Sequence, residues 1–280
     1  MPDITLNIAG LNLRLDSNNS RPIQRLKKHY NIFLNGNNRP DLSVSLSSLK
    51  HSPRQRRGLT LHQGSPQATS DSLNVRWKDE TVRISTRQFA IRLDLSQRKG
   101  LVQYCSGAGW VDVVRLLYAI LLLRKGGFLI HASGVVHRGR SYVFCGPSES
   151  GKTTIARLSE NRPVLTDETT AIVKERRNYY AYATPFYGDA GPVMANIGAP
   201  LEAIFFIYKA THFSYQRLTP TEALKTALPN IMLNIQSNQW TNKLLDSLLL
   251  LTKQIPCYNL YFKPETKLWS YIDGFIKSNN

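Results

Sequence analysis

A glycine-rich turn near the middle of the chain carries residue types that bind phosphate. The segment SYVFCGPSESGKTTIARLSE contains Gly146, four variable residues, and then Gly151, Lys152 and Thr153. A glycine-bearing turn between a strand and a helix presents bare backbone N–H groups to an anion. In such a loop the lysine reaches the β- and γ-phosphates, and the threonine hydroxyl is a ligand for Mg²⁺. The pattern therefore predicts a site for ATP and magnesium. The expected nucleotide contacts are Gly146, Pro147, Ser148, Glu149, Ser150, Gly151, Lys152, Thr153 and Thr154.

Two adjacent carboxylates, Asp167 and Glu168, end the apolar run PVLT, which we expect to be a strand. In an open α/β sheet, ligands collect beyond the carboxyl ends of the strands, so both acids should face the phosphates held by the loop. One carboxylate can hold Mg²⁺, and the other can accept a proton from an attacking hydroxyl. The alternative is a pair of turn acids that only end a strand.

Two histidines precede the loop. His131 lies among apolar residues in FLIHASGVV, which by itself is typical of a core histidine. His137 stands beside the turn HRGR, and we expect it on the surface.

The combination LIHASGVV, FCGPSESGKTTIARL and PVLTDET, within residues 128–173, resembles the HPr kinase/phosphorylase group. The core of that group is similar to that of phosphoenolpyruvate carboxykinases. The resemblance implies an α/β P-loop kinase core in which a histidine strand precedes the phosphate loop and an acidic pair closes the following strand. It implies that Asp167 is the catalytic base and that Glu168, with Thr153, places Mg²⁺. It also implies that His131 lies near Asp167 and adjusts its basicity.

The chain departs from that group in ways that bear on the reaction. True HPr kinases carry Ser-Glu after the loop lysine, whereas this chain has Thr153 and Thr154, and their C-terminal signature for the reverse reaction has no counterpart here. Similar proteins include kinases that phosphorylate a serine of a ribosomal peptide, such as lasso-peptide precursors. We therefore expect transfer of the γ-phosphoryl group of ATP to a serine of a peptide or small protein.

Other functions stay open at this point. The chain could be an HPr-type serine kinase/phosphorylase, a kinase of a small-molecule alcohol, or a nucleotide-binding regulatory protein without turnover. Asp189, in the segment FYGDAG, is either an active-site loop residue or a surface turn acid. The resemblance also allows a homo-oligomer.

The pattern along the chain predicts two parts. Residues 1–107 alternate apolar and polar residues in short runs, which indicates a β-rich N-terminal region. Residues 108–280 are expected to form the kinase core, with helices at 110–125 and after Thr219 and further helices toward the C-terminus. A polar segment containing Arg54, Arg56 and Arg57 is expected to be a basic loop.

Composition restricts the partners and the compartment. Lys and Arg number 36 against 19 Asp and Glu, a net charge of +17, which favours an acidic partner. The basic residues are spread over the chain without an aromatic-and-basic motif, which argues against nucleic acid. The longest apolar run, LLYAILLL, is too short to cross a membrane, and the three scattered cysteines are typical of reduced thiols. We therefore expect a cytoplasmic protein.

Overall fold

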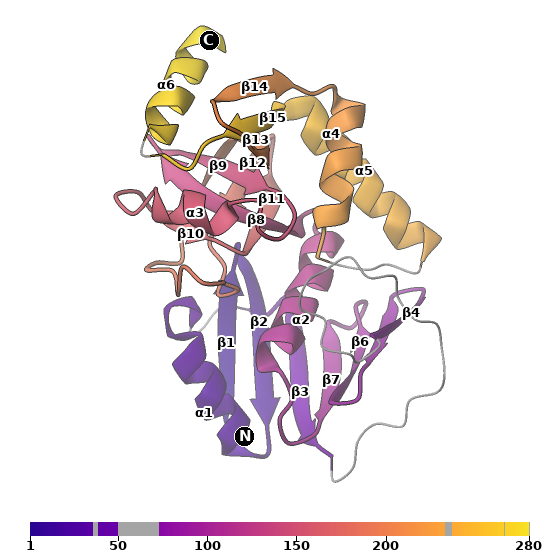
Figure 1. The fold of residues 1–280 in the computed structure, drawn as a ribbon. Helices are drawn as coiled ribbons and strands as arrows, with labels where there is room; N and C mark the ends of the chain where they lie inside the picture. Colours follow the sequence, from indigo (N-terminus) through magenta and orange to yellow (C-terminus); the bar gives the residue numbers. More distant parts are fainter. Residues whose placement is uncertain (36–38, 50–72, 233–236, 266, 280) are drawn as a thin grey trace. The chain divides into compact units, whose positions relative to one another are not determined.

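The computed structural model describes residues 1–35, 39–49, 73–232, 237–265 and 267–279. The fold is mixed α/β with two sheets (Figure 1). It divides into two compact units, which we call unit 1 (Met1–Arg124 and Leu233–Leu244) and unit 2 (Lys125–Met232 and Leu245–Asn280). The boundary expected between residues 107 and 108 stays a prediction, and the basic loop with Arg54, Arg56 and Arg57 lies outside the described residues.

Unit 1 is built on a seven-stranded sheet with the spatial order β1-β2-β3-β7-β6-β5-β4. The strands are β1 (Asp3–Ile8), β2 (Leu11–Ser17), β3 (Leu42–Ser48), β4 (Asn74–Lys78), β5 (Thr81–Ser85), β6 (Phe89–Asp94) and β7 (Lys99–Tyr104). Strand β3 pairs in parallel with β2 and β7, and the other pairs are antiparallel. Buried and exposed side chains alternate along most of these strands, so one face of the sheet is packed and the other is open.

Helices α1 (Ser20–His29) and α2 (Trp110–Arg124) cover the packed face of this sheet (Figure 1). The side chain of Asn19 accepts the N–H of Arg21 and so caps the start of α1. Helix α2 buries most of its side chains, and the Tyr118 hydroxyl donates to the carbonyl of Leu6 at 2.7 Å. The expected helix at 110–125 is therefore confirmed. A short 3₁₀ helix, η1 (Asn31–Phe33), follows α1.

Unit 2 is built on an eight-stranded, largely antiparallel sheet. Its order is β10-β8-β11-β12-β13-β15-β14, and β9 pairs with both β8 and β13. The strands are β8 (Phe128–His137), β9 (Arg140–Cys145), β10 (Val164–Thr166), β11 (Thr169–Glu175), β12 (Asn178–Tyr182), β13 (Gly198–Lys209), β14 (Ser214–Arg217) and β15 (Cys257–Phe262). The helices are α3 (Lys152–Arg157), α4 (Pro220–Ala227), η2 (Leu228–Asn230), α5 (Asn238–Gln254), which begins in unit 1, and α6 (Leu268–Asn279).

Most of the predicted elements of unit 2 are present. Helix α4 starts with the expected capping box, in which Thr219 and Glu222 each bond the backbone of the other. The segment PVLTDETTAIV is not one strand, because a bend at residues 167–168 separates β10 from β11. The Thr166 hydroxyl accepts the N–H groups of Glu168 and Thr169 at 3.1 and 3.3 Å, and this side-chain turn interrupts the strand. Strands β14 and β15 were not expected.

Helices α3 and α6 pack on one face of the unit 2 sheet and form its main core. The cluster contains buried residues of β8, β9, β13, β15, α3 and α6: Val135, Tyr142, Phe144, Ile155, Ala203, Phe205, Ile207, Tyr258, Leu260, Phe262, Leu268, Trp269 and Ile272. Ile155 is fully buried in this cluster, so α3 is fixed against the strands. This packing holds in place the loop that enters α3. Among the described residues, no helix is long and apolar enough to cross a membrane.

Candidate functional site

The segment between β9 and α3, residues 146–151, is a tight turn that only glycine permits at two positions. A Cβ at Gly146 would stand 2.5 Å from the Ser150 hydroxyl. Gly151 has φ +113°, and a Cβ there would meet the ring of Phe262 at 2.6 Å. Glu149 is also in the left-handed region, with φ +63°. Loops with such residues turn successive backbone N–H groups into a concave anion-binding surface. We call residues 146–151 the glycine loop.

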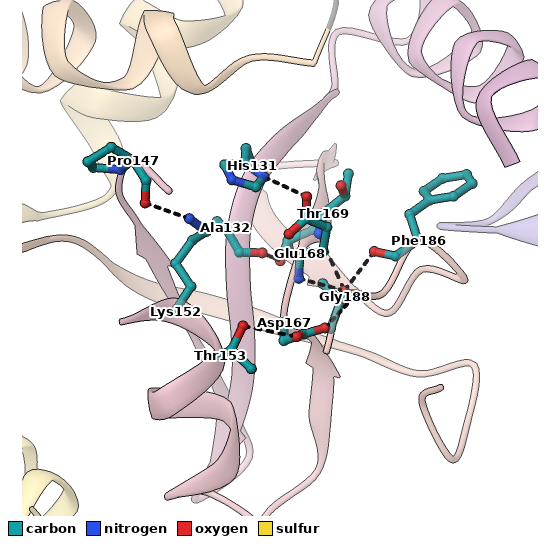
Figure 2. A network of polar contacts seen from close by, with 12 residues as sticks. His131, Ala132, Pro147, Lys152, Thr153, Asp167, Glu168, Thr169, Phe186 and Gly188 are labelled. Atoms are coloured by element: carbon teal, nitrogen blue, oxygen red, sulfur yellow. Dashed lines mark hydrogen bonds and ion pairs between the residues drawn. The ribbon is translucent and has the colours of Figure 1, made fainter. Parts of the chain in front are cut away.

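Lys152 begins α3 and folds back over the glycine loop. Its ammonium group donates to the carbonyls of Gly146 and Pro147, both at 2.9 Å, and the side chain is buried (Figure 2). Burial lowers the pKa of Lys152, and the carboxylate of Glu168 is the largest of the charges that oppose this effect. Lys152 is thus a buried cation that backbone carbonyls hold at the glycine loop.

Asp167 lies against the first turn of α3. The Thr153 hydroxyl donates to Asp167 Oδ2 at 3.2 Å, as Figure 2 shows. The Asp167 carboxylate is only 1% exposed, and it also accepts the N–H of Gly188 at 2.7 Å and of Ala190 at 2.9 Å. The structure therefore brings Asp167 close to the glycine loop. The sheet that positions it is largely antiparallel, whereas the sequence suggested the carboxyl end of an open α/β sheet.

Glu168 points to a different partner. Its Oε1 lies 3.3 Å from Nδ1 of His131 on β8, and its side chain is 29% exposed. The backbone carbonyl of Glu168 accepts the N–H of Ala132 at 3.1 Å. His131 was expected beside Asp167, whereas its ion pair in the structure is with Glu168. The two acids thus face different groups, Asp167 toward Thr153 and Glu168 toward His131.

The remaining predicted loop residues differ in exposure. Pro147, Ser148 and Glu149 are exposed, whereas Thr154 is half-buried on α3. Ser150 is buried, and its hydroxyl has no hydrogen-bond partner among the described residues. A buried hydroxyl beside the loop is a further polar group that a bound phosphate could satisfy.

The segment 186–190 also lies at the site, and little in the sequence indicated its role. The carbonyl of Phe186 accepts the Thr166 hydroxyl at 3.0 Å. A Cβ at Gly188 would lie 3.1 Å from Asp167 Oδ2 and 3.4 Å from Glu168 Oε2, so this position tolerates little bulk. Asp189, for which the sequence left an active-site role and a surface position open, is exposed and contributes its backbone carbonyl to Arg157 at 3.4 Å. The glycine before Asp189 was the only available signal.

His137 was expected on the surface, and this expectation is wrong. The residue is 8% exposed, and its Nε2 lies 2.7 Å from Asp273 Oδ1. Arg162 Nε donates to His137 Nδ1 at 2.9 Å, and the ring packs on Trp269. Helix α6, which the local pattern near His137 could not reveal, covers this histidine.

The donors around Thr153 fit a magnesium ion. Mg²⁺ binds oxygen ligands, commonly one or two carboxylates together with phosphate oxygens and water. The Thr153 hydroxyl and the Asp167 carboxylate supply such oxygens side by side. Within the described ranges, no group of three or more His, Cys, Asp or Glu could hold a metal alone. The protein therefore offers part of a coordination shell, which a nucleotide would complete.

Comparison with known proteins gives a family match and distant structural likenesses. The family model described as "SynChlorMet cassette protein ScmC" matches residues 106–277, which is more than half of the chain. No curated protein sequence matches the chain. A matching solved structure is the Hpr(Ser) kinase/phosphatase from Coxiella burnetii, with 8% sequence identity and a TM-score of 0.32. The match covers 54% of this chain and 89% of that chain. We infer nothing about activity from so distant a likeness.

Proposed function

This chain belongs to the SynChlorMet cassette protein ScmC family, and we propose that it is an ATP- and Mg²⁺-dependent kinase with a hydroxyl acceptor. The observation that carries the proposal is the 3.2 Å hydrogen bond between Thr153 and Asp167. This bond places a buried carboxylate against the residue that follows the loop lysine. Phosphoryl transfer needs such an arrangement, because its catalysis is mostly positioning and neutralisation of charge.

Each residue then has a part in binding the triphosphate. The backbone N–H groups of the glycine loop and the Lys152 ammonium hold phosphate oxygens, and the Ser150 hydroxyl is a further donor. Helix α3 is only six residues long, so its dipole has no assigned part in this binding. Thr153 and Asp167 would hold Mg²⁺, which supplies positive charge to the transferring phosphoryl group. This role for Asp167 differs from the one that the family resemblance implies.

We assign the proton-accepting role to Glu168. Its carboxylate is the acid with the larger effect on Lys152, and it is more exposed than Asp167. An acceptor oxygen would form a bond to the γ-phosphorus while the bond to the bridging oxygen of ADP breaks. The hydroxyl proton passes to Glu168, and His131 holds that carboxylate in place. Asp167 is less suited to this step, because its oxygens already accept three hydrogen bonds.

The acceptor that we propose is a serine of a peptide or small protein. Two observations support a polypeptide over a small alcohol. The net charge of +17 attracts acidic polypeptides, and the segment 188–191 beside the two acids is exposed at Asp189 and Ala190. The family resemblance points to the same acceptor class.

Two variants test the division of roles between the acids. The protein is incubated with γ-labelled ATP and a mixture of serine-containing peptides, and the magnesium concentration is varied. Asp167→Asn should raise the magnesium concentration needed for half-maximal transfer. Glu168→Gln should lower transfer by about a hundredfold or more at every magnesium concentration.

Two results would contradict the proposal. If Glu168→Gln shifted the magnesium requirement and Asp167→Asn did not, the roles would return to those that the resemblance implies. If the parent protein bound ATP but labelled no peptide and no protein of a cell extract, it would be a nucleotide-binding protein without turnover.

A further inference from the structure

Three arginines stand side by side on the open face of the unit 1 sheet. Arg76 on β4 lies directly opposite Arg83 on β5, and Arg83 lies directly opposite Arg92 on β6. All three are exposed, whereas their strand neighbours Val82 and Ile91 are buried on the packed face. We call Arg76, Arg83 and Arg92 the arginine ladder.

The three positive charges of the arginine ladder repel one another. Adjacent strands are about 4.8 Å apart, and like charges directly opposite each other destabilise an antiparallel pair. Among the residues that the structure describes, none of the three arginines forms an ion pair. Asp94, on the same face, accepts the Ser96 hydroxyl at 2.6 Å and the N–H of Gln97 at 3.0 Å. Its pKa is lowered mainly by Ser96, and the charge of Arg92 is the smallest cause.

The surroundings of the ladder favour a peptide over a nucleic acid. Binding of single-stranded nucleic acid usually adds aromatic side chains on which bases stack. The described open-face positions of β4 to β7 contain none: Asn74, Arg76, Lys78, Thr81, Arg83, Ser85, Ala90, Arg92, Asp94, Lys99, Leu101 and Gln103. Leu101, which is 37% exposed, lies directly opposite Arg92 and continues the row with an apolar contact.

The spacing also suits an acidic peptide. Carboxylates three or four residues apart on a helix are separated by about 5–6 Å, close to the distance between neighbouring strands. Guanidinium groups bind carboxylates in a two-pronged geometry, which arginine provides better than lysine. An acidic segment with an apolar residue at one end would therefore match both the charges and Leu101.

We propose that the arginine ladder is a docking site for an acidic segment of the peptide that this protein phosphorylates. That the segment belongs to the phosphate acceptor rests on the proposed function. The docking of an acidic peptide does not, since it depends only on unit 1. In the free protein the three arginines repel one another, and the partner's carboxylates would remove this repulsion on binding.

Binding is measured without ATP, by fluorescence anisotropy of a labelled short poly-glutamate peptide. The variant Arg76→Gln, Arg83→Gln and Arg92→Gln should bind the peptide at least about tenfold more weakly than the parent. The matched control is Arg21→Gln, Arg25→Gln and Lys28→Gln, which makes the same change of charge at exposed positions of α1. This control should keep most of the affinity.

Several results would overturn the proposal. One is that the parent does not bind poly-glutamate. Another is that both triple variants lose the same amount of affinity for the peptide, which would show that only the net charge matters. A third is that the parent binds a labelled single-stranded oligonucleotide but not poly-glutamate, and that the ladder variant loses this binding. That result would assign the face to nucleic acid.

A second measurement separates recognition from folding. If the ladder is strained in the free protein, Arg83→Gln should raise the midpoint of thermal unfolding while it weakens peptide binding. A lowered midpoint would show that the ladder serves the fold and would overturn the proposal. Phosphoryl transfer to a serine peptide with an acidic tail is assayed in parallel. Poly-glutamate binding without any transfer would refute the kinase and leave the docking site standing.

Discussion

The two ends of strand β8 each carry a histidine paired with a carboxylate, but their surroundings differ. His131 lies 3.3 Å from Glu168, and both side chains keep some exposure beside the glycine loop. His137 lies 2.7 Å from Asp273, and Trp269 packs on its ring. Two histidine–carboxylate pairs thus occupy different surroundings, one next to the glycine loop and the other covered by Trp269.

The hydrogen bonds around His137 select one tautomer of its ring. Arg162 donates to His137 Nδ1, and a guanidinium group has only donors, so this nitrogen must act as the acceptor. Nε2 then carries the proton and donates to Asp273. The guanidinium of Arg162 also stacks on Trp269, with its carbon 4.6 Å from the ring centre. Both ring nitrogens of His137 are therefore engaged, Nε2 with Asp273 of α6 and Nδ1 with Arg162 between α3 and β10, which leaves none for chemistry.

The difference shows that a histidine–carboxylate pair is not by itself a sign of catalysis. What distinguishes the two ends is the presence of Lys152 and Thr153 near the acids at one end and of Trp269 at the other. Substitutions near His131 should therefore change activity, and substitution of His137 should change stability.

The largest effect is expected from Lys152→Met. Loss of the cation should lower phosphoryl transfer by about a hundredfold to a thousandfold, because transition-state charge would lose its stabilising partner. The fold should be as stable as the parent or more so, since a buried charge is removed. Transfer rates and thermal unfolding measure these outcomes. Lys243→Met is the control, because Lys243 also has a pKa lowered by burial and donates to a backbone carbonyl, that of Arg124. It should leave transfer unchanged.

His131→Asn should have the next largest effect on activity. The variant loses the group that orients Glu168, and transfer should fall by about tenfold to a hundredfold. Stability should change by less than about 1 kcal/mol, since the pair is partly solvated. The ATP concentration for half-maximal rate should stay the same, because His131 acts on Glu168, which lies outside the glycine loop. An unchanged rate in His131→Asn would remove this end of β8 from the mechanism.

His137→Ala should show the opposite pattern. The substitution leaves Asp273 and Arg162 without their buried partner, and the free energy of unfolding should fall by about 2–3 kcal/mol. Transfer by the folded fraction should stay within about twofold of the parent, since no site group is touched. Chemical denaturation and initial rates at low temperature provide the two measurements. If transfer fell further than stability explains, His137 would belong to the working site.

The smallest effect concerns alkaline pH. Cys145, opposite Ala132 of β8, has a thiol pKa raised by burial, and burial raises the pKa of Cys257 to about 12. An unfolded chain ionises these thiols from about pH 9, so it releases protons before the folded state does. The stability that the two buried thiols contribute is fully present below about pH 9 and is lost as the pH rises above that value. Cys257→Ala should therefore reduce the loss of stability between pH 8 and pH 10 by about 1 kcal/mol. Denaturation curves at both pH values test this, and an unchanged loss would contradict it.

Much of the candidate site could be predicted from the sequence because it is local. The glycine loop lies within one short segment, and the conformations of Glu149 and Gly151 follow from sterics within that turn. The helix that starts after Thr219 was predictable for the same reason, since its capping box spans four consecutive residues. The resemblance added Asp167, Glu168 and His131 as candidates, but it paired the histidine with the other acid.

What the sequence could not determine depends on register and long-range packing. Whether Asp167 or Glu168 meets Thr153 is decided by the bend that Thr166 makes between β10 and β11. The amides of Gly188 and Ala190 reach Asp167 only because their segment folds back over that bend. The arginine ladder likewise exists only in the observed strand pairing, because a shift by one residue would turn its members to the packed face.

By itself, then, the sequence determined the turn of the glycine loop, since the backbone angles and glycines that it requires are set by neighbours in the chain. The tertiary structure alone decided the partners of the charged groups. Such groups meet across strands, and only the packed sheet fixes which side chains come within hydrogen-bonding distance. His137 is the clearest case: its neighbours in sequence suggested exposure to solvent, whereas α6, far along the chain, covers it and supplies Asp273 as its partner.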